Sequence, residues 1–291
     1  MCTAIAYRGC ANYLCRTLDL NYHYHEEVVL TPRKFPLPFR DAKTLQSHYA
    51  MIGMAMVADG SPLYYDAVNE AGIGAVALRF RELAHYSPKE RGRDNIATFE
   101  VIPWILGQCA SMEDVLSLLH RMHVTDTPAS EEYEVSPLHW MITDGVRSVT
   151  VEPTKEGLQV TENPFGVLTN EPVFAEQLAA YGRLGEDEDP PGGYSSQARF
   201  VRGVWLNSRM APGGVSAAYR LMDAVAVPRG GADDDMATLY TAVCDLEKGL
   251  YCYTTEHCLK PFSFGLFDHD LDHRELTRYG LVWDGEQKPC P

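Results

Sequence analysis

The amino-acid sequence begins with MCTAIAYRGCANYLCRTLD (residues 1–19), the stretch that constrains the fold most strongly. Two runs of mostly apolar and β-branched residues, 3–7 and 12–16, lie on either side of a break at Gly9. Short runs of this kind around a glycine predict a β-hairpin. We therefore expect a neighbouring strand to hold the N-terminus of the chain in place.

Strand-like and helical segments follow one another in groups along the rest of the chain. Short apolar runs between Gly, Pro or Asp predict strands at residues 28–31, 49–57, 63–68, 74–78, 138–143, 149–153, 158–161, 238–245 and 250–255. Apolar residues spaced three to four apart predict helices at residues 99–108, 111–120, 173–181, 196–207 and 215–225. Ser111 and Asp114 resemble a capping box at the start of the second helix. This order predicts the α+β class, with packed antiparallel sheets covered by helices on the outside.

Length and composition indicate a folded protein with a sizeable core. The 291 residues are enough for one large domain or two ordinary ones, and 45% of them are hydrophobic while 22% are charged. The clearest loop, EDEDPPGG (186–193), is too short for a domain linker. We expect a single domain over residues 2–291, with Met1 removed.

The formal net charge of -15 argues against nucleic-acid and membrane partners, because a nucleic-acid backbone or an anionic membrane surface would be repelled on average. No stretch approaches the roughly 20 apolar residues that span a bilayer, and the N-terminus lacks a basic segment followed by an apolar run. We therefore predict a cytoplasmic protein. Most of its eight cysteines are then expected to be reduced thiols.

Cys2 would become the N-terminal residue once Met1 is removed. A free α-amino group has a pKa of about 7.7 to 8.0, so near neutral pH it can accept a proton from a thiol of pKa about 8.5. Nucleophile and base then belong to one residue. Arg16 and Asp19 lie on the neighbouring predicted strand, where a cation can stabilise a thiolate and a carboxylate can orient an ammonium group. The residues alone also allow an incidental cysteine beside a plain salt bridge.

Several segments, in one order along the chain, resemble a known family. They are MCTAIAY, CRTLD, EEVVLTPR, LYYDAVNEAGIG, NIATFEVIPWILGQC, LHWMITD, FGVLTNEP and PGGYSSQARFVR. They resemble the choloylglycine hydrolase family, which contains bile salt hydrolases and penicillin V acylases and belongs to the N-terminal nucleophile hydrolases. The resemblance implies a four-layer αββα sandwich. It also implies amide hydrolysis through an acyl-enzyme that water then hydrolyses.

The resemblance assigns a role to each matching residue. Cys2 matches the nucleophile, and Arg16 and Asp19 match the pair that tunes it and positions its α-amine. Asn170, in LTNEP, matches the side-chain donor of the oxyanion hole, which binds the charge that develops on the carbonyl oxygen. Arg199, in SSQARFVR, matches the second arginine beside the thiol.

Arg79 marks a departure from the family pattern. The other oxyanion donor of the family is a backbone N–H, which maps onto Arg79 in VALRF, where bile salt hydrolases usually have Asn and penicillin V acylases often have Tyr. Because a backbone N–H does not depend on its side chain, we expect catalysis to survive the change. Arg79 or Arg81 can bind an anionic end of the substrate, or Arg79 can be a solvated arginine at a strand end.

A second departure concerns the segment between Asn170 and Arg199, which are only 29 positions apart. Many Gram-positive relatives carry a long loop here, through which they form tetramers and which also shapes the substrate mouth. That loop is missing from this sequence. Whether the chain forms a homo-oligomer is therefore left open.

The sequence predicts no metal site and no cofactor. The histidine-rich segment NYHYHEE (21–27) has no accompanying C-x-x-C pair. Gly72 and Gly74 lack the third glycine of a nucleotide-binding turn. His139, in LHWMITD, is expected in the core or at an interface, since the α-amino group already supplies the base.

Three functions stay open at this stage. The first is a conjugated bile salt hydrolase, which releases glycine or taurine from a small-molecule amide. The second is a penicillin V acylase or an acyl-homoserine lactone acylase. The segment TDTPASEEYEVSP (125–137) is more polar than a steroid pocket requires, which weakens the first function without identifying a replacement. The third is a catalytically silent binding protein, which would not need Cys2, Arg16, Asp19 and the other matching residues together.

Overall fold

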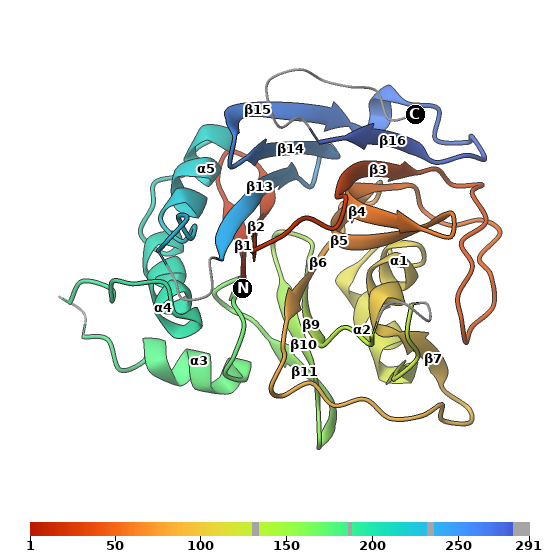
Figure 1. Cartoon of the computed structure of the whole chain (residues 1–291), viewed down its shortest axis with the longest axis horizontal. Helices are drawn as coiled ribbons and strands as arrows, with labels where there is room; N and C mark the ends of the chain where they lie inside the picture. The colour runs from red at the N-terminus through yellow and green to blue at the C-terminus, as the bar shows by residue number, and fades with distance from the viewer. Residues whose placement is uncertain (130–133, 186–187, 232–235, 282–291) are drawn as a thin grey trace.

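Two large sheets form the centre of the molecule (Figure 1). The computed structural model describes residues 1–129, 134–185, 188–231 and 236–281. Apolar side chains from both sheets, such as Leu14 and Val76, fill the space between them, and helices cover the outer faces. The α+β class and the four-layer αββα sandwich are thus confirmed.

Each sheet is antiparallel throughout its described strands. The first has six strands in the order β12 (Val167–Leu168), β1 (Cys2–Arg8), β2 (Asn12–Leu20), β13 (Ala237–Asp245), β14 (Leu250–Thr255) and β15 (Cys258–Gly265). The second has eight, in the order β11 (Gly157–Glu162), β10 (Ser148–Thr154), β9 (Leu138–Thr143), β6 (Gly74–Arg79), β5 (Ser61–Asn69), β4 (Met51–Ala58), β3 (Glu27–Thr31) and β16 (Thr277–Gly280).

Helices lie on both sides of the paired sheets (Figure 1). Three of them cover the six-stranded sheet: α3 (Phe174–Tyr181), α4 (Ser196–Asn207) and α5 (Val215–Asp223). The eight-stranded sheet is covered by the short helix η1 (Thr98–Glu100), α1 (Val101–Leu106), α2 (Met112–Arg121) and the parallel pair β7 (Asp94–Ala97) and β8 (Met122–Thr125). The Oγ of Ser111 accepts the backbone N–H of Asp114, so the predicted cap of α2 is confirmed.

The N-terminal hairpin lies inside the six-stranded sheet. Strands β1 and β2 pair along their whole length, with Cys2 opposite Leu18, as the sequence predicts. Strand β13 pairs with the other edge of β2, and its register shifts between Thr238 and Tyr240. A β-bulge of this kind re-aims side chains. Here it leaves Thr238 opposite Asp19.

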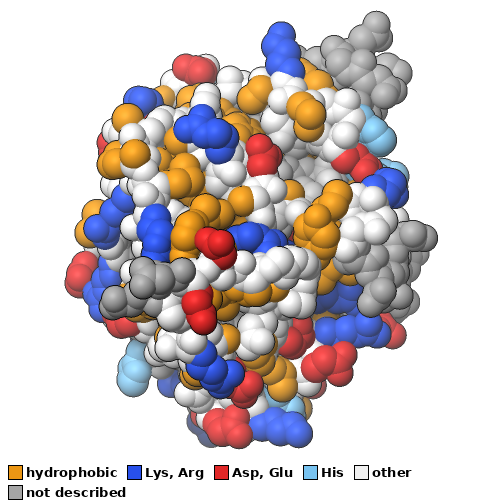
Figure 2. Space-filling model, turned by 90° about the vertical axis from the view of Figure 1, so that its left-hand side faces the viewer, with side chains coloured by type: hydrophobic (Ala, Val, Ile, Leu, Met, Phe, Trp, Pro, Cys, Tyr) orange, Lys and Arg blue, Asp and Glu red, His pale blue; other side chains and the backbone are white. Residues whose placement is uncertain are grey.

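The outer surface of the helical side carries mixed side chains. Figure 2 shows hydrophobic, acidic and basic groups interspersed over this face. Within the described ranges, no helix is both long enough and apolar enough to cross a membrane.

Candidate active site

The thiol of Cys2 lies against a buried guanidinium. Cys2 is the first residue of β1, and Arg16 projects from β2, the strand paired with it. The Nη2 of Arg16 lies 3.2 Å from the Sγ of Cys2, and both residues are buried. A fixed positive charge this close stabilises a thiolate over a thiol.

Arg16 is anchored by acidic groups that the sequence analysis did not single out. Its Nη1 lies 3.4 Å from the carboxylate of Asp66, on β5 of the opposite sheet. The hydroxyls of Tyr240 and Tyr251 donate to the same carboxylate at 2.7 and 2.6 Å. Burial alone would lower the pKa of Arg16, but Tyr240, Cys2 and Asp66 raise it above its ordinary value. The guanidinium therefore stays charged beside the thiol.

Met1 is still attached in this structure, so the nitrogen of Cys2 is an amide that stands for the α-amine of a processed chain. Its N–H donates to the Oδ1 of Asn170 at 2.8 Å. Met1 extends the strand: its α-amine donates to the carbonyl of Asp19, whose N–H donates back to the carbonyl of Met1 at 2.9 Å. Loss of Met1 would therefore leave the nitrogen of Cys2 at the end of β1.

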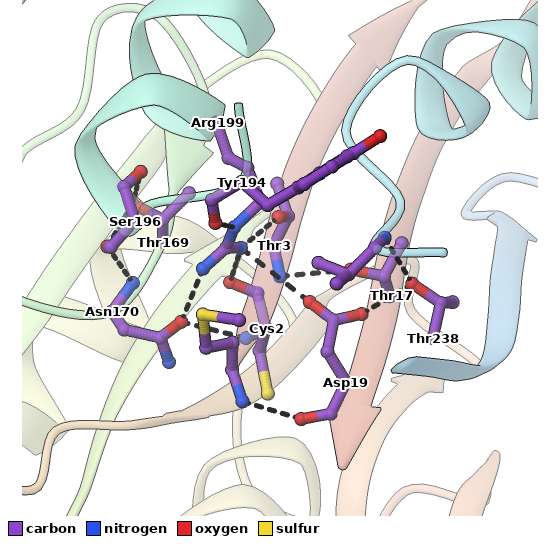
Figure 3. Close-up of polar contacts among 12 residues, drawn as sticks. Cys2, Thr3, Thr17, Asp19, Thr169, Asn170, Tyr194, Ser196, Arg199 and Thr238 are labelled. Atoms are coloured by element: carbon purple, nitrogen blue, oxygen red, sulfur yellow. Dashed lines mark hydrogen bonds and ion pairs between the residues drawn. The ribbon is translucent and has the colours of Figure 1, made fainter. Parts of the chain in front are cut away.

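The carboxylate of Asp19 is fully buried and lies beside Arg199, which also contacts the main chain of Cys2 (Figure 3). Its Oδ1 accepts the hydroxyl of Thr238 at 2.7 Å, and its Oδ2 lies 3.7 Å from the Nη1 of Arg199. Among the described residues no hydrogen bond donor reaches Oδ2. The Nη1 of Arg199 thus connects this oxygen with the main chain of Cys2, the residue that would carry the α-ammonium group.

Arg199, on α4, contacts the main chain of Cys2 (Figure 3). Its Nη1 donates to the carbonyl oxygen of Cys2 and to the Oγ1 of Thr3, both at 2.6 Å, and its Nη2 donates to the Oδ1 of Asn170 at 2.8 Å. Burial lowers the pKa of Arg199, although Asp19 and Cys2 act against it. Arg199 thus lies next to the backbone of Cys2, whereas Arg16 is the arginine at the sulfur.

The two expected oxyanion donors lie side by side. The Nδ2 of Asn170 donates one of its two hydrogens to the carbonyl of Arg79 at 2.8 Å. The N–H of Phe80 donates to Pro137, beside β9. Because backbone groups alternate in direction along a strand, the N–H of Arg79 faces away from β9, on the same side as its carbonyl. The N–H of Arg79 therefore faces the side on which the Asn170 amide lies, and the Oδ1 of the same amide accepts the N–H of Cys2.

A cavity of about 620 Å³ opens at this point. Met1, Arg79 and Asn170 are part of its wall, together with Tyr194 and Met236. Arg79 and Asn170 thus line the cavity, while Cys2, Asp19 and Arg199 contact residues that line it. Arg16 lies one step further away and reaches the site through the thiol of Cys2. A buried thiol with a cation beside it and N–H donors nearby is the arrangement that acyl transfer requires.

Two expectations from the sequence, the absence of a metal site and the effect of the polar segment 125–137 on the substrate pocket, stay untested. In the part of the chain that the structure describes, no three His, Cys, Asp or Glu side chains gather as metal ligands would. The His23 Nδ1 instead lies 3.3 Å from Glu26. Residues 130–133, in the polar segment 125–137, lie outside the described residues.

Comparisons with known proteins agree with this arrangement. Residues 2–279 match the family described as linear amide C-N hydrolases, choloylglycine hydrolase family. The chain is 35% identical to a bile salt hydrolase/transferase of Lactiplantibacillus plantarum over 97% of both chains, and 29% identical to one of Clostridium perfringens over 96% of both. The chain therefore belongs to the choloylglycine hydrolase family.

Solved structures show the same fold. A mutant conjugated bile acid hydrolase from Clostridium perfringens superposes with a TM-score of 0.92, at 28% identity, over 98% of both chains. The penicillin V acylase of Agrobacterium tumefaciens gives a TM-score of 0.80 at 20% identity, over 95% of this chain and 90% of that one. At this lower identity the likeness concerns the fold alone.

Proposed function

We propose that the protein hydrolyses conjugated bile salts and releases glycine or taurine through an acyl-enzyme on Cys2. The contact between the Nη2 of Arg16 and the Sγ of Cys2 is the observation that carries the chemistry. The near full-length similarity to bile salt hydrolases supports the substrate class. The proposal requires removal of Met1, which would leave residues 2–291 as a single domain.

The reaction uses the α-amine of Cys2 as the base. The amine takes the thiol proton, and the thiolate forms a bond to the amide carbon. The carbonyl oxygen becomes an oxyanion that accepts hydrogen bonds from the Nδ2 of Asn170 and the N–H of Arg79. The ammonium then returns its proton to the leaving nitrogen as the C–N bond breaks. Water hydrolyses the thioester by the same route and restores the thiol.

Asp19 and Arg199 support the base and the main chain in this scheme. Asp19 stabilises the protonated amine through charge, since its Oδ2 is buried and accepts no hydrogen bond from the described residues. Arg199 fixes the carbonyl of Cys2 and the Oδ1 of Asn170, so that nucleophile and oxyanion donor keep one geometry.

The side chain of Arg79 is the proposed partner of the anionic glycine or taurine group. Arg79 lines the cavity. The pKa of the Met1 α-amine is lowered, chiefly by burial and in addition by the charges of Arg199 and Arg79, so the charge of Arg79 is felt at the N-terminus. Arg79→Ala should raise the KM for both conjugates roughly fivefold to tenfold, with kcat nearly unchanged. Arg81→Ala, at a more exposed position of the same cavity, is the matched comparison. An unchanged KM in both variants would contradict an arginine partner.

Release of free amine from glycocholate, taurocholate and penicillin V tests the proposal. Processed protein should release glycine or taurine, and Cys2→Ala should abolish the reaction. Cys10→Ala, an exposed cysteine at the turn of the same hairpin, should have no effect. Protein that retains Met1 should be inactive, since it lacks the free amine. Preferential cleavage of penicillin V would move the assignment to the acylase branch. A cytoplasmic location stays a prediction of the sequence, and whether the chain forms a homo-oligomer stays open.

A further inference from the structure

The two proposed oxyanion donors come from segments far apart in the sequence. Arg79 ends β6 of the eight-stranded sheet, whereas Asn170 follows β12 of the six-stranded sheet. Their relative position decides whether both reach one oxygen atom. A single fully buried side chain contacts the chain neighbours of both: His139 of β9.

On one side, the ring of His139 fixes the strand end that carries Arg79. It stacks on the ring of Phe80, with centroids 4.4 Å apart and planes 8° apart. The pairing of β9 with β6 places His139 opposite Leu78. Phe80 and Leu78 are the two chain neighbours of Arg79, so His139 contacts the side chain of one neighbour and pairs through the sheet with the other.

On the other side, the same ring fixes the segment that carries Asn170. The Nε2 of His139 lies 2.8 Å from the carbonyl oxygen of Thr169, the residue before Asn170. A carbonyl can only accept, so Nε2 carries the hydrogen. Nδ1 lies 3.4 Å from Glu152, whose carboxylate also accepts the N–H of Phe174 at 3.0 Å. His139 and Glu152 thus hold both ends of the segment from Thr169 to Phe174.

We propose that His139 is a positioning residue for the oxyanion hole, which rests on the proposed amide hydrolysis. Its donation to Thr169 and its stacking on Phe80 set the distance between the Asn170 amide and the Arg79 N–H. Among the described residues, the side chain of His139 contacts Phe80, Glu152 and Thr169, and it does not line the cavity beside Cys2. His139 therefore acts on the transition state through the two oxyanion donors, whereas Arg16 acts on the thiol.

Two substitutions distinguish the hydrogen bond donated to Thr169 from the packing volume of the side chain at position 139. In His139→Gln the side-chain amide can reach the place of Nε2 and donate to Thr169, whereas His139→Leu fills the site without a donor. His48 provides a matched control, because both ring nitrogens of this buried histidine also have oxygen partners, the carbonyls of Tyr49 and Phe35 at 2.8 Å. His48 takes no part in the site. His48→Leu should lower the melting temperature and leave kcat unchanged.

The expected result is a loss in kcat that depends on the donor. His139→Leu should lower kcat roughly 10- to 100-fold, less than outright removal of an oxyanion donor, with KM changed less than about threefold. His139→Gln should recover most of kcat. The pH midpoint of Cys2 alkylation by iodoacetamide should be the same in all variants. Equal kcat values in the Leu and Gln variants, or a shifted alkylation midpoint, would overturn the positioning role.

Two further arms keep the test decisive. If His139→Leu does not fold, His139→Asn replaces it, since asparagine can keep the contact at the place of Nδ1 but cannot donate to Thr169, and it should lose kcat like Leu. An aldehyde analogue of the acyl group forms a hemithioacetal with Cys2 and needs no turnover; the Leu variant should bind it at least tenfold more weakly. If the wild type cleaves only penicillin V, the bile salt proposal fails while the His139 comparison proceeds on that substrate.

Discussion

Arg16 and Arg199 both lie buried against Cys2, and their partners differ in kind. Arg16 faces the sulfur and is held by the carboxylate of Asp66. Arg199 faces the carbonyl of Cys2, and its hydrogen bonds go to neutral oxygens, with Asp19 at the longer distance of 3.7 Å. Acidic neighbours raise the pKa of Arg16 in spite of burial, whereas burial lowers the pKa of Arg199.

This difference gives separate tasks to Arg16 and Arg199, which the sequence analysis placed together beside the thiol. A guanidinium with a full counter-charge behind it can act on a thiolate without being an uncompensated buried charge. A guanidinium whose fork is spread over carbonyl, hydroxyl and amide oxygens fixes their positions instead. We therefore expect loss of Arg16 to change the titration of the thiol, and loss of Arg199 to change geometry.

The largest effect is expected for Arg16→Met. The pH midpoint of Cys2 alkylation by iodoacetamide should rise, because the cation that lies against the sulfur is gone. Asp66 would be left buried without its cation, so the free energy of unfolding should fall by about 3 to 5 kcal/mol in urea titrations. A double variant with Asp66→Asn should regain much of this stability but keep the raised midpoint. An unchanged midpoint in Arg16→Met would refute the electrostatic role.

Glu100 shows what a buried carboxylate does when backbone groups hold it. It accepts the N–H groups of Arg40 at 2.6 Å and Ala97 at 3.1 Å, and burial raises its pKa from 4.5 to about 7. The folded protein therefore binds this proton more tightly than the unfolded chain, so the stability from Glu100 is present below about pH 4.5 and is lost as the pH rises through about 7.

Glu100→Gln should remove this pH dependence. Between pH 4.5 and 8 the free energy of unfolding of the wild type should fall by about 3 kcal/mol more than that of the variant, as the raised pKa implies. Urea titrations of both proteins across this range measure the difference, in which all other titrating groups cancel. Parallel pH profiles would show that Glu100 is ionised in the folded protein.

Arg199→Lys tests the geometric task. An ammonium group cannot present the planar fork that joins Cys2, Thr3 and Asn170. We expect kcat to fall roughly 10- to 100-fold, about 1.4 to 2.7 kcal/mol in the barrier, while the alkylation midpoint moves by less than about half a pH unit. A midpoint shift as large as that of Arg16→Met would remove the distinction between the two arginines.

Local patterns in the sequence predicted most of the fold. Segments with clear periodicity, such as the N-terminal hairpin and α4, lie where they were expected. Strand β15 was missed because it is an edge strand in which half of the residues are exposed and none is fully buried. Strand β16 was missed because its partner β3 lies almost a whole chain length away, and β12 has only two residues.

The predicted N-terminal hairpin indicated Cys2, Arg16 and Asp19, and the other site residues were predicted only where the family resemblance supplied a motif. Cys2, Arg16 and Asn170 belong to such motifs, and the structure brings them together. Tyr240 and Tyr251 were missed because their contact with Asp66 forms only when the two sheets pack, 174 and 185 positions along the chain. One signal was available: an aspartate inside the strand-like run LYYDAVN predicts a buried charge that needs a partner.

The smallest effect is expected at Thr238, the residue of β13 that the β-bulge leaves opposite Asp19. Its hydroxyl donates to the Oδ1 of Asp19 and accepts the N–H of Val227 at 2.8 Å. Thr238→Val keeps the shape and removes both bonds, so Asp19 becomes less firmly placed beside the nitrogen of Cys2. A net hydrogen bond of about 1 kcal/mol corresponds to a roughly fivefold lower kcat. Thr238→Ser keeps the hydroxyl and should match the wild type. If the Val variant is as active as the Ser variant, the hydroxyl of Thr238 does not place Asp19. Arg199 is then the other described side chain that contacts this carboxylate, and its geometric task is larger than its hydrogen bonds to Cys2 and Asn170 indicate.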